Sequence, residues 1–236
     1  MSTRTKQRAR QARQVIAAQH AAERRRRMLV TSAVVAALLL VAGLIGYGVY
    51  VNQRPEQVNA PREAVQSGTG LSVGDGPVTV DLYVDFLCPA CKQYEEQASP
   101  TLHRYLDEGK ITLVYHPLNI LDRLSTTDYS TRAGAAAAVA AEEGTLLEYA
   151  EALFAQQPPE GGAGLTDQQL IEIGRSVGLT SDRFAKAVTS DKYHDWMTYV
   201  TAKADERGVR GTPTVLVNGE PVESTVTALT TAIDAT

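Results

Sequence analysis

The stretch VTVDLYVDFLCPACKQYEEQASPTL, residues 78–102, decides the fold class of this chain. Its first part alternates apolar and polar residues, which is the period of two expected of a half-buried β-strand. The strand is predicted to end at Cys88, and Pro89 suits the first turn of a helix that follows. Both cysteines of the C-P-A-C motif therefore lie where a strand passes into a helix.

The segments around this stretch complete an α/β pattern. The run KITLVYH at 110–116 predicts a second strand. A strand, helix, strand order of this length favours a parallel pair with a right-handed crossover. The other predicted elements are a short edge strand near 70–73, helices within about 122–208, a strand at 213–217, an Asn218-Gly219 turn and a helix at 225–233.

The amino-terminal part of the chain differs in charge from the rest. Residues 1–27 hold nine Lys or Arg and one acid, a net charge of +8, which leaves −12 for the remainder. Residues 28–51 carry no charge, and 24 residues of helix reach about 36 Å, enough for a hydrocarbon core of about 30 Å. We expect a transmembrane helix at 28–51, a linker at 52–76 and the α/β domain at 77–236.

The asymmetry of charge predicts the orientation of this segment. Basic residues gather before it, and only Arg54 and Arg62 follow soon after, so the positive-inside rule puts the amino terminus in the cytoplasm and the domain outside it. A cleaved signal peptide is the alternative, although its apolar region is typically only about 7–15 residues. The basic run Arg24–Arg27 also resembles a nucleic-acid patch, but its position beside the apolar segment favours a membrane flank and no nucleic-acid partner.

Cys88 and Cys91 are the only cysteines in 236 residues, which limits the chemistry of the pair. A structural zinc site needs about four ligands, and the four histidines are scattered, so no metal is expected. A structural disulfide is the other alternative, since an extracytoplasmic compartment is oxidising. That bond would close a very small loop and stabilise the fold little. Thiol-disulfide exchange is therefore the favoured chemistry.

The position of the pair predicts unequal roles. Cys88 lies at the start of the helix, where unpaired backbone N–H groups and the helix dipole stabilise a thiolate. Cys91 lies one turn into the helix, where it is expected to be more buried and less ionised. Cys88 is thus the predicted nucleophile, and Cys91 the thiol that resolves a mixed disulfide at Cys88.

The residues around the motif resemble the DsbA-like family of bacterial thiol-disulfide oxidoreductases. The likeness extends from 78–102 to the segments YHPL at 115–118 and VRGTPT at 209–214, and covers about residues 77–236. It implies a thioredoxin-like α/β fold with an inserted helical domain at about 122–208. It also implies that Pro213 is a cis-proline, and that Thr212 and Pro213 face the cysteines and bind the substrate peptide. A trans Pro213 at the start of a strand is the alternative.

Three residues near the motif bear on how strongly the pair oxidises. Ala90 stands where a strongly oxidising family member has histidine, and Leu82 where many relatives have a buried acid. Asp85 is the nearest acid in the sequence. If it lies close to the pair it modulates the thiolate pKa or relays protons, and otherwise it is a solvated carboxylate at a strand end.

These features predict a membrane-anchored dithiol oxidase that uses no cofactor. Its expected partners are exported cysteine-containing proteins, the lipid bilayer and a membrane redox protein that recycles the pair. The same cysteines serve a reductase or an isomerase, because the direction of exchange follows the redox potential and the partner. A peptide-binding or chaperone-like module without redox catalysis is the alternative from another class.

Overall fold

The computed structural model describes residues 28, 31–32, 35–36, 38–47, 58–190 and 192–236. The chain divides into two units, residues 1–57 and 58–236. The predicted cytoplasmic tail and parts of the predicted transmembrane segment and linker lie outside the described residues. Residues 38–47 are helical and exposed. Within the described ranges, no helix combines the length and the apolar character that crossing a membrane requires.

The second unit is built on a mixed β-sheet. Its six strands, counted over the described part of residues 58–236, run in the order β1-β2-β4-β3-β5-β6. The central pair β3 and β4 is parallel, and the other neighbours are antiparallel. The strands are β1 (Ala64–Val65), β2 (Gly70–Val73), β3 (Val78–Val84), β4 (Ile111–Pro117), β5 (Thr214–Val217) and β6 (Glu220–Val222).

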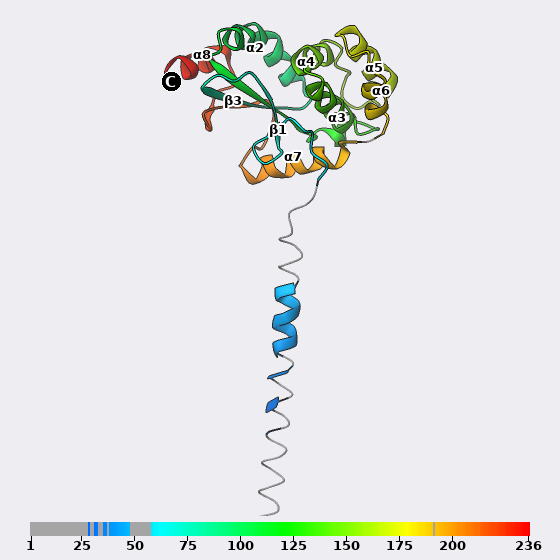
Figure 1. The fold of residues 1–236 in the computed structure, drawn as a ribbon, viewed down its shortest axis with the longest axis vertical. Helices are drawn as coiled ribbons and strands as arrows, with labels where there is room; N and C mark the ends of the chain where they lie inside the picture. The colour runs from blue at the N-terminus through cyan, green and yellow to red at the C-terminus, as the bar shows by residue number, and fades with distance from the viewer. Residues whose placement is uncertain (1–27, 29–30, 33–34, 37, 48–57, 191) are drawn as a thin grey trace, which may run out of the picture. The chain divides into compact units, whose positions relative to one another are not determined.

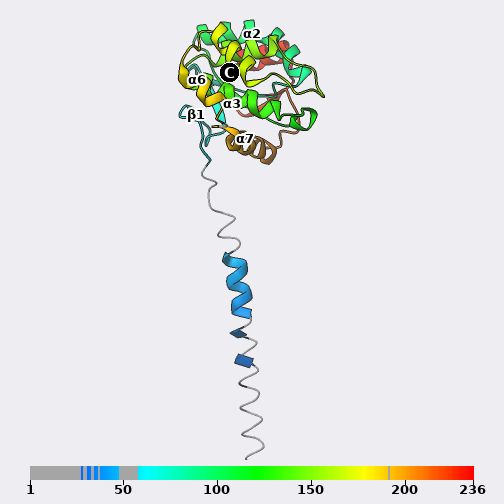
Figure 2. The same ribbon diagram turned by 90° about the vertical axis from the view of Figure 1, so that its right-hand side faces the viewer.

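Helices cover both faces of the sheet and one end of it. Figure 1 shows α2 and α8 on one face and α7 on the other, and the view turned by 90° again puts α7 on the side away from α2 (Figure 2). The helices α3 to α6 pack on one another beside the sheet. The bounds are α2 (Pro89–Asp107), α3 (Tyr129–Glu142), α4 (Leu146–Ala155), α5 (Asp167–Ser176), α6 (Asp182–Val188), α7 (His194–Glu206) and α8 (Val226–Asp234), with a 3₁₀ turn η1 at Asp122–Leu124.

The helix α2 carries the cysteine motif and crosses from β3 to β4. Its buried residues recur every three or four positions and so form one stripe against the sheet. Most of them are apolar, but Glu95 lies in the same stripe. The buried members are Cys91, Tyr94, Glu95, Ala98, Leu102 and Tyr105. The stripe anchors the motif to the core while Cys88 stays at the helix end.

The α/β pattern expected from the sequence is confirmed. The β3–α2–β4 unit is parallel as predicted, Thr166 and Ser181 cap α5 and α6, and the helical insertion is present. The strand expected near 70–73 is β2, but β1 and not β2 forms the edge of the sheet. The linker predicted at 52–76 overlaps these two strands, because the second unit begins at Val58.

Candidate active site

Cys88 occupies the junction between β3 and α2 that the alternation of residues predicted. It is the N-cap of α2, with extended backbone angles, and Pro89 follows in the first turn. The backbone N–H groups of Cys91 and Lys92 both donate to the Cys88 carbonyl oxygen, at 3.1 and 3.2 Å. Both cysteines are free thiols, with Cys88 7% exposed and Cys91 fully buried.

The environment of Cys88 favours its thiolate. A hydrogen bond from the Cys91 thiol lowers the pKa of Cys88 to about 5, and burial opposes this effect. Thr212 and the backbone N–H groups of Cys91 and Ala90 lower the pKa further. These N–H groups belong to the first turn of α2, at the positive end of the helix dipole. The thiolate is therefore stabilised at the helix end as expected.

Cys91 has the opposite tendency. Burial raises the pKa of its thiol far above the usual range, and the neighbouring Cys88 thiolate raises it further. At neutral pH the reduced pair consequently holds one thiolate on Cys88 and one proton on Cys91. This asymmetry matches the predicted division into a nucleophile and a resolving thiol.

The loop that ends at β5 lies against Cys88. The Thr212–Pro213 peptide bond is cis, which confirms the expectation for Pro213. The Cys88 sulfur lies 3.4 Å from the Thr212 carbonyl oxygen, although the two residues are 124 positions apart. Ser224 donates to the Pro213 carbonyl oxygen at 3.1 Å and ties the loop to the segment before α8. The structure thus brings together Cys88, Cys91, Thr212 and Pro213.

Asp85 is not the solvated carboxylate of the alternative interpretation, because it is fully buried. Its carboxylate accepts hydrogen bonds from the backbone N–H groups of Leu87 and Leu121, at 2.9 and 2.8 Å, and from the Ser130 hydroxyl at 2.6 Å. Burial raises its pKa to about 6 although these donors lower it. Through these hydrogen bonds, Asp85 connects the end of β3 beside Cys88 to the loop after β4 and to α3.

Gln157, in the loop after α4, contacts the active-site turn. This residue was not predicted from the sequence. Its side-chain N–H group donates to the carbonyl oxygens of Phe86 and Cys88, at 2.9 and 3.0 Å. The helical insertion therefore holds the backbone of the motif through one amide. A glutamine in a loop rich in proline and glycine gives no local signal of this contact, which depends on the packing of α4 against α2.

Glu95 is a buried acid that sequence analysis also missed. It is 5% exposed and accepts a hydrogen bond from the Tyr115 hydroxyl at 3.4 Å. A signal was available, because an acid four residues after Cys91 lies on the same face of the helix. Leu82, by contrast, is buried in β3 among apolar residues, so no carboxylate stands at its position. The site therefore has two buried acids, Asp85 at the end of β3 and Glu95 on α2.

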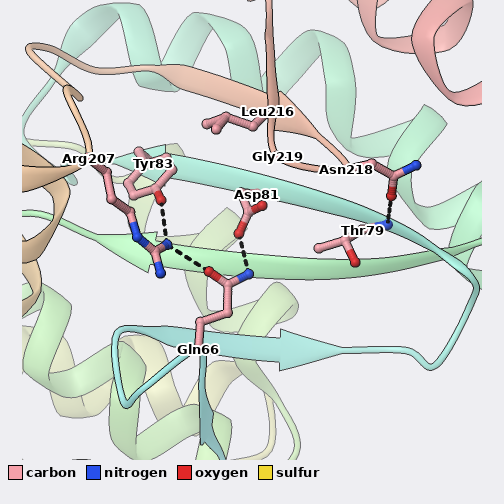
Figure 3. Close-up of a pocket in the computed structure, with 8 residues that line it drawn as sticks. All are labelled: Gln66, Thr79, Asp81, Tyr83, Arg207, Leu216, Asn218 and Gly219. Atoms are coloured by element: carbon pink, nitrogen blue, oxygen red, sulfur yellow. Dashed lines mark hydrogen bonds between the residues drawn. The ribbon is translucent and has the colours of Figure 1, made fainter.

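A second buried polar cluster lies on the other face of the sheet (Figure 3). Asp81 accepts hydrogen bonds from His116 Nε2 at 2.9 Å and from Gln66 at 2.6 Å. His116 Nδ1 lies 2.9 Å from the Thr69 carbonyl oxygen. Both ring nitrogens of His116 therefore face an oxygen atom of another residue. Arg207 closes the cluster by donating to Gln66 and to the Tyr83 hydroxyl, at 2.8 and 3.2 Å.

Burial raises the pKa of Asp81, but hydrogen bonds from His116 and Gln66 outweigh burial and keep it below its ordinary value. Asp81 is accordingly charged at neutral pH and paired. Across the described residues, no group of three or more His, Cys, Asp or Glu side chains has the arrangement that would hold a metal ion.

Comparison with known proteins agrees with this geometry. The sequence profile described as "Thioredoxin" matches residues 66–235. The reduced crystal structure of DsbA from Mycobacterium tuberculosis is similar, with 32% identity, a TM-score of 0.63, and coverage of 71% of this chain and 92% of that one. The probable disulfide bond formation protein D of Bacillus anthracis is 27% identical over 83% of this chain and 89% of its own length.

One longer relative shares the same region. The Na⁺/H⁺ antiporter NhaA 3 of Salinispora tropica is 30% identical over 177 residues, which are 75% of this chain but only 24% of that protein. The chain therefore spans about a quarter of that relative's length. Because the family profile covers most of the chain and the solved DsbA is matched over nearly all of its length, the chain belongs to the thioredoxin family and, within it, to the DsbA-like thiol-disulfide oxidoreductases.

Proposed function

We propose that this chain is an extracytoplasmic dithiol oxidase that forms disulfides in exported proteins through Cys88 and Cys91. The observation that carries the proposal is the lowered pKa of Cys88, about 5, beside a buried and protonated Cys91. A stabilised thiolate is a good leaving group and also stabilises the reduced form of the pair, which makes the disulfide form more oxidising.

The size of this effect follows from the pKa. At pH 7 a thiol whose pKa falls from 9.0 to about 5 gains about 3 kcal/mol from ionisation, or roughly 60 mV for a two-electron couple. This free energy is smaller than the full pKa shift would give. A thiol with the ordinary pKa is protonated at pH 7, so only the part of the shift below pH 7 stabilises the thiolate. This stabilisation favours transfer of the disulfide from the pair to a substrate.

In the proposed reaction a substrate thiolate attacks the Cys88 sulfur of the disulfide form. The bond between Cys88 and Cys91 breaks, Cys91 leaves as a thiolate that takes up a proton, and a mixed disulfide forms. A second substrate thiolate then attacks the substrate sulfur of that bond and releases Cys88 as a thiolate. The substrate is oxidised, the pair is reduced, and a membrane redox partner reoxidises it.

A groove beside the loop that carries Thr212 supports a peptide substrate. The groove has a volume of about 420 Å³ and is lined mainly by apolar groups of the β4–η1 connection, α7 and the loop that leads to Thr212. Its residues include Leu118, Ile120, Ala202 and Val209. We assign it to the apolar side chains of an unfolded cysteine-containing substrate, and Thr212 and Pro213 to contacts with the substrate backbone beside the reacting sulfur.

The location of the domain is part of the proposal. The uncharged segment at 28–51 and the basic residues before it support a single-pass anchor with a cytoplasmic amino terminus. Such an anchor keeps the pair beside a recycling partner in the membrane.

Fusion of a reporter that is active only outside the cytoplasm tests this orientation. The carboxyl-terminal fusion is expected to be active and a fusion at residue 27 inactive. The reverse result contradicts the orientation.

The redox potential tests the direction of the reaction. The full chain in detergent is equilibrated with mixtures of reduced and oxidised glutathione, and the fraction of Cys88–Cys91 disulfide is measured by mass. A value nearer about −120 mV supports the oxidase, whereas a value near about −270 mV indicates a reductase. A chain that binds unfolded peptide but exchanges no disulfide is instead a peptide-binding module.

A further inference from the structure

A pocket on the sheet face opposite α2 has no part in the proposed reaction (Figure 3). It has a volume of about 600 Å³, within the range of about 300–1,000 Å³ that is typical of small-molecule sites. The β1–β2 turn, the strands β3 and β5 and the end of α7 border it. Its lining includes Gln66, Asp81, Tyr83, Arg207 and Leu216. The pocket therefore offers a small ligand both charged and apolar groups.

Two opposite charges lie in this pocket without pairing with each other. The Gln66 amide stands between them, because its Nε2 donates to Asp81 Oδ1 at 2.6 Å and its Oε1 accepts from Arg207 Nη1 at 2.8 Å. In the part of the chain that the structure describes, the Asp81 carboxylate and the Arg207 guanidinium make no direct contact. The guanidinium still lowers the pKa of Asp81 through its charge. The two charges are thus close neighbours held apart by one amide.

Each charged group keeps one atom available for a ligand. Both side-chain hydrogen bonds that Asp81 accepts, from His116 and Gln66, end on Oδ1. Figure 3 shows the second oxygen of Asp81 turned away from Gln66. Both side-chain hydrogen bonds of Arg207 leave from Nη1. Asp81 Oδ2 and Arg207 Nη2 therefore have no partner within the described ranges, and charged atoms of this kind form the stronger hydrogen bonds.

The turn that carries Gln66 is fixed in place by α7. Gln66 and Ser67 have φ of 52° and 62°, in the left-handed region that residues other than glycine seldom adopt. The Tyr199 hydroxyl donates to the Ser67 carbonyl oxygen at 3.1 Å, and Trp196 Nε1 donates to that of Gly68 at 2.6 Å. The Gln66 amide consequently holds the two charges at a set spacing before a ligand binds, which reduces the entropy cost of binding.

We propose that this pocket binds a free α-amino acid as a zwitterion, with its ammonium group on Asp81 Oδ2 and its carboxylate on Arg207 Nη2. The Gln66 amide presents a donor to Asp81 and an acceptor to Arg207 across an N–C–O unit. An α-amino acid presents the same polarity across N–C–C–O, so it can lie beside the amide and reach both charges. The proposal goes beyond the oxidase function, because it assigns a ligand to residues that the exchange reaction does not use.

The charges of the pocket disfavour other small ligands. A lone cation meets the Arg207 guanidinium and a lone anion meets the Asp81 carboxylate, and a like charge placed nearby opposes binding. A neutral sugar can form the hydrogen bonds but leaves both charges without a counter-charge. A zwitterion compensates both charges, and its own hydrogen bonds are charge-assisted.

Leu216 predicts the side chain of the ligand. It lies directly opposite Asp81 in the antiparallel β3–β5 pair, and it is half-buried. Side chains paired in this way have Cβ atoms about 4.5–5.5 Å apart, so a ligand held by Asp81 has its own side chain within reach of Leu216. We therefore expect an aliphatic amino acid such as leucine to bind about 10-fold more tightly than glycine.

The experiment is an NMR titration of the full, isotope-labelled chain in detergent with L-leucine. It follows the side-chain amide signals of Gln66 and of Asn218, which also lines the pocket. We expect saturable shifts with a dissociation constant of about 1 mM, the affinity that two hydrogen bonds to charged groups supply. L-leucinamide lacks the carboxylate and N-acetyl-L-leucine lacks the ammonium group, so each is expected to bind at least about 10-fold more weakly.

Two variants test the predicted contact with the ligand carboxylate. Arg207→Gln is expected to weaken leucine binding about 10-fold and to leave leucinamide binding unchanged, because leucinamide has no carboxylate for the guanidinium. Arg175→Gln removes an exposed arginine of α5, outside the pocket, and is expected to bind leucine like wild type. Unchanged NMR signals outside the pocket report correct folding of both variants.

Several results overturn the proposal. These are the absence of saturable shifts with leucine, equal binding of leucine and either blocked derivative, and wild-type binding in Arg207→Gln. D-glucose is the neutral probe, and binding as tight as that of leucine refutes the zwitterion as ligand. Binding of glycine as tight as that of leucine refutes the contact with Leu216.

Discussion

Tyr115 and His116 are neighbours in β4, both fully buried, and they serve two polar clusters on opposite faces of the sheet. Successive residues of a strand point to opposite faces, so one residue step separates the two environments. Tyr115 reaches Glu95 beside the cysteine pair. His116 contacts Asp81, which Figure 3 shows beside Gln66.

The two clusters differ in how fully their charges are paired. Asp81 has two side-chain donors and His116 two acceptors, and the pKa of Asp81 is lowered. Glu95 has one long hydrogen bond, and its pKa rises to about 7. A buried acid whose partners outweigh the cost of burial keeps its charge at neutral pH, whereas one for which burial outweighs its partners titrates near neutral pH. We infer that the Asp81 and His116 cluster stabilises the fold, whereas the Glu95 and Tyr115 cluster leaves an acid that titrates near neutral pH.

Removing the nucleophile is expected to have the largest effect. Cys88→Ser should abolish exchange with glutathione, because serine cannot form a disulfide. Cys91→Ser should still form the adduct but leave it unresolved. Mass measurement after incubation distinguishes the two variants. Exchange at Cys91 in the Cys88→Ser variant would contradict the assigned roles.

Breaking the paired cluster is expected to cost stability but not chemistry. His116→Leu leaves the buried Asp81 carboxylate without the hydrogen bond from His116 and should lower the free energy of unfolding by about 2–3 kcal/mol. Urea unfolding measures the change, and Asp75→Asn, at an exposed carboxylate, is the control and should change it by less than about 0.5 kcal/mol. The folded variant should exchange thiols at the wild-type rate, and a changed Cys88 pKa would show that the clusters are coupled.

The pH dependence of the free energy of unfolding of the reduced protein tests the lowered pKa of Cys88. The folded pKa of Cys88, about 5, is below its unfolded value of about 9, so the folded state binds fewer protons between these values. Its stabilisation is absent at low pH and should grow by about 3–4 kcal/mol from pH 5 to pH 8.

The matched comparison for this pH effect is reduced wild type against Cys88→Ala, measured by urea unfolding at each pH. The opposing contributions of Asp85 and Glu95, whose folded pKa values are raised, are common to both proteins and cancel in the difference. A difference that does not vary with pH would refute the lowered Cys88 pKa.

The smallest effects are expected at Gln157, which contacts the active-site turn, and at Arg207, at the edge of the Asp81 cluster. Gln157→Ala removes two hydrogen bonds to the turn that carries Cys88, and should cost about 1–2 kcal/mol of stability and change the Cys88 alkylation rate. Arg207→Ala removes an exposed cation from the other cluster and should cost under about 1 kcal/mol with no change in alkylation. If both variants change the Cys88 alkylation rate equally, Gln157 has no specific effect on the active-site turn.

Local pattern accounts for most of the fold. The alternation in β3, the proline after Cys88 and the Asn218-Gly219 turn each act over a few residues, and the structure agrees with all of them. The two-residue strand β1 escaped prediction because such a strand has too few residues to show a period. The cis-proline was expected only through family resemblance, since Thr212 meets Cys88 across 124 positions.

The sequence by itself determined the α/β class, the redox pair and its unequal cysteines, because spacing and helix position act locally. The tertiary structure decided which polar residues are buried and with which partners. Asp81, Asp85 and Glu95 are all acids within one stretch of 15 residues, yet one has its pKa lowered and two have it raised. The reason is that the pKa of a buried acid depends on how far the donors supplied by distant segments offset its burial. His116 and Gln66 outweigh burial for Asp81, whereas burial outweighs the donors of Asp85 and Glu95.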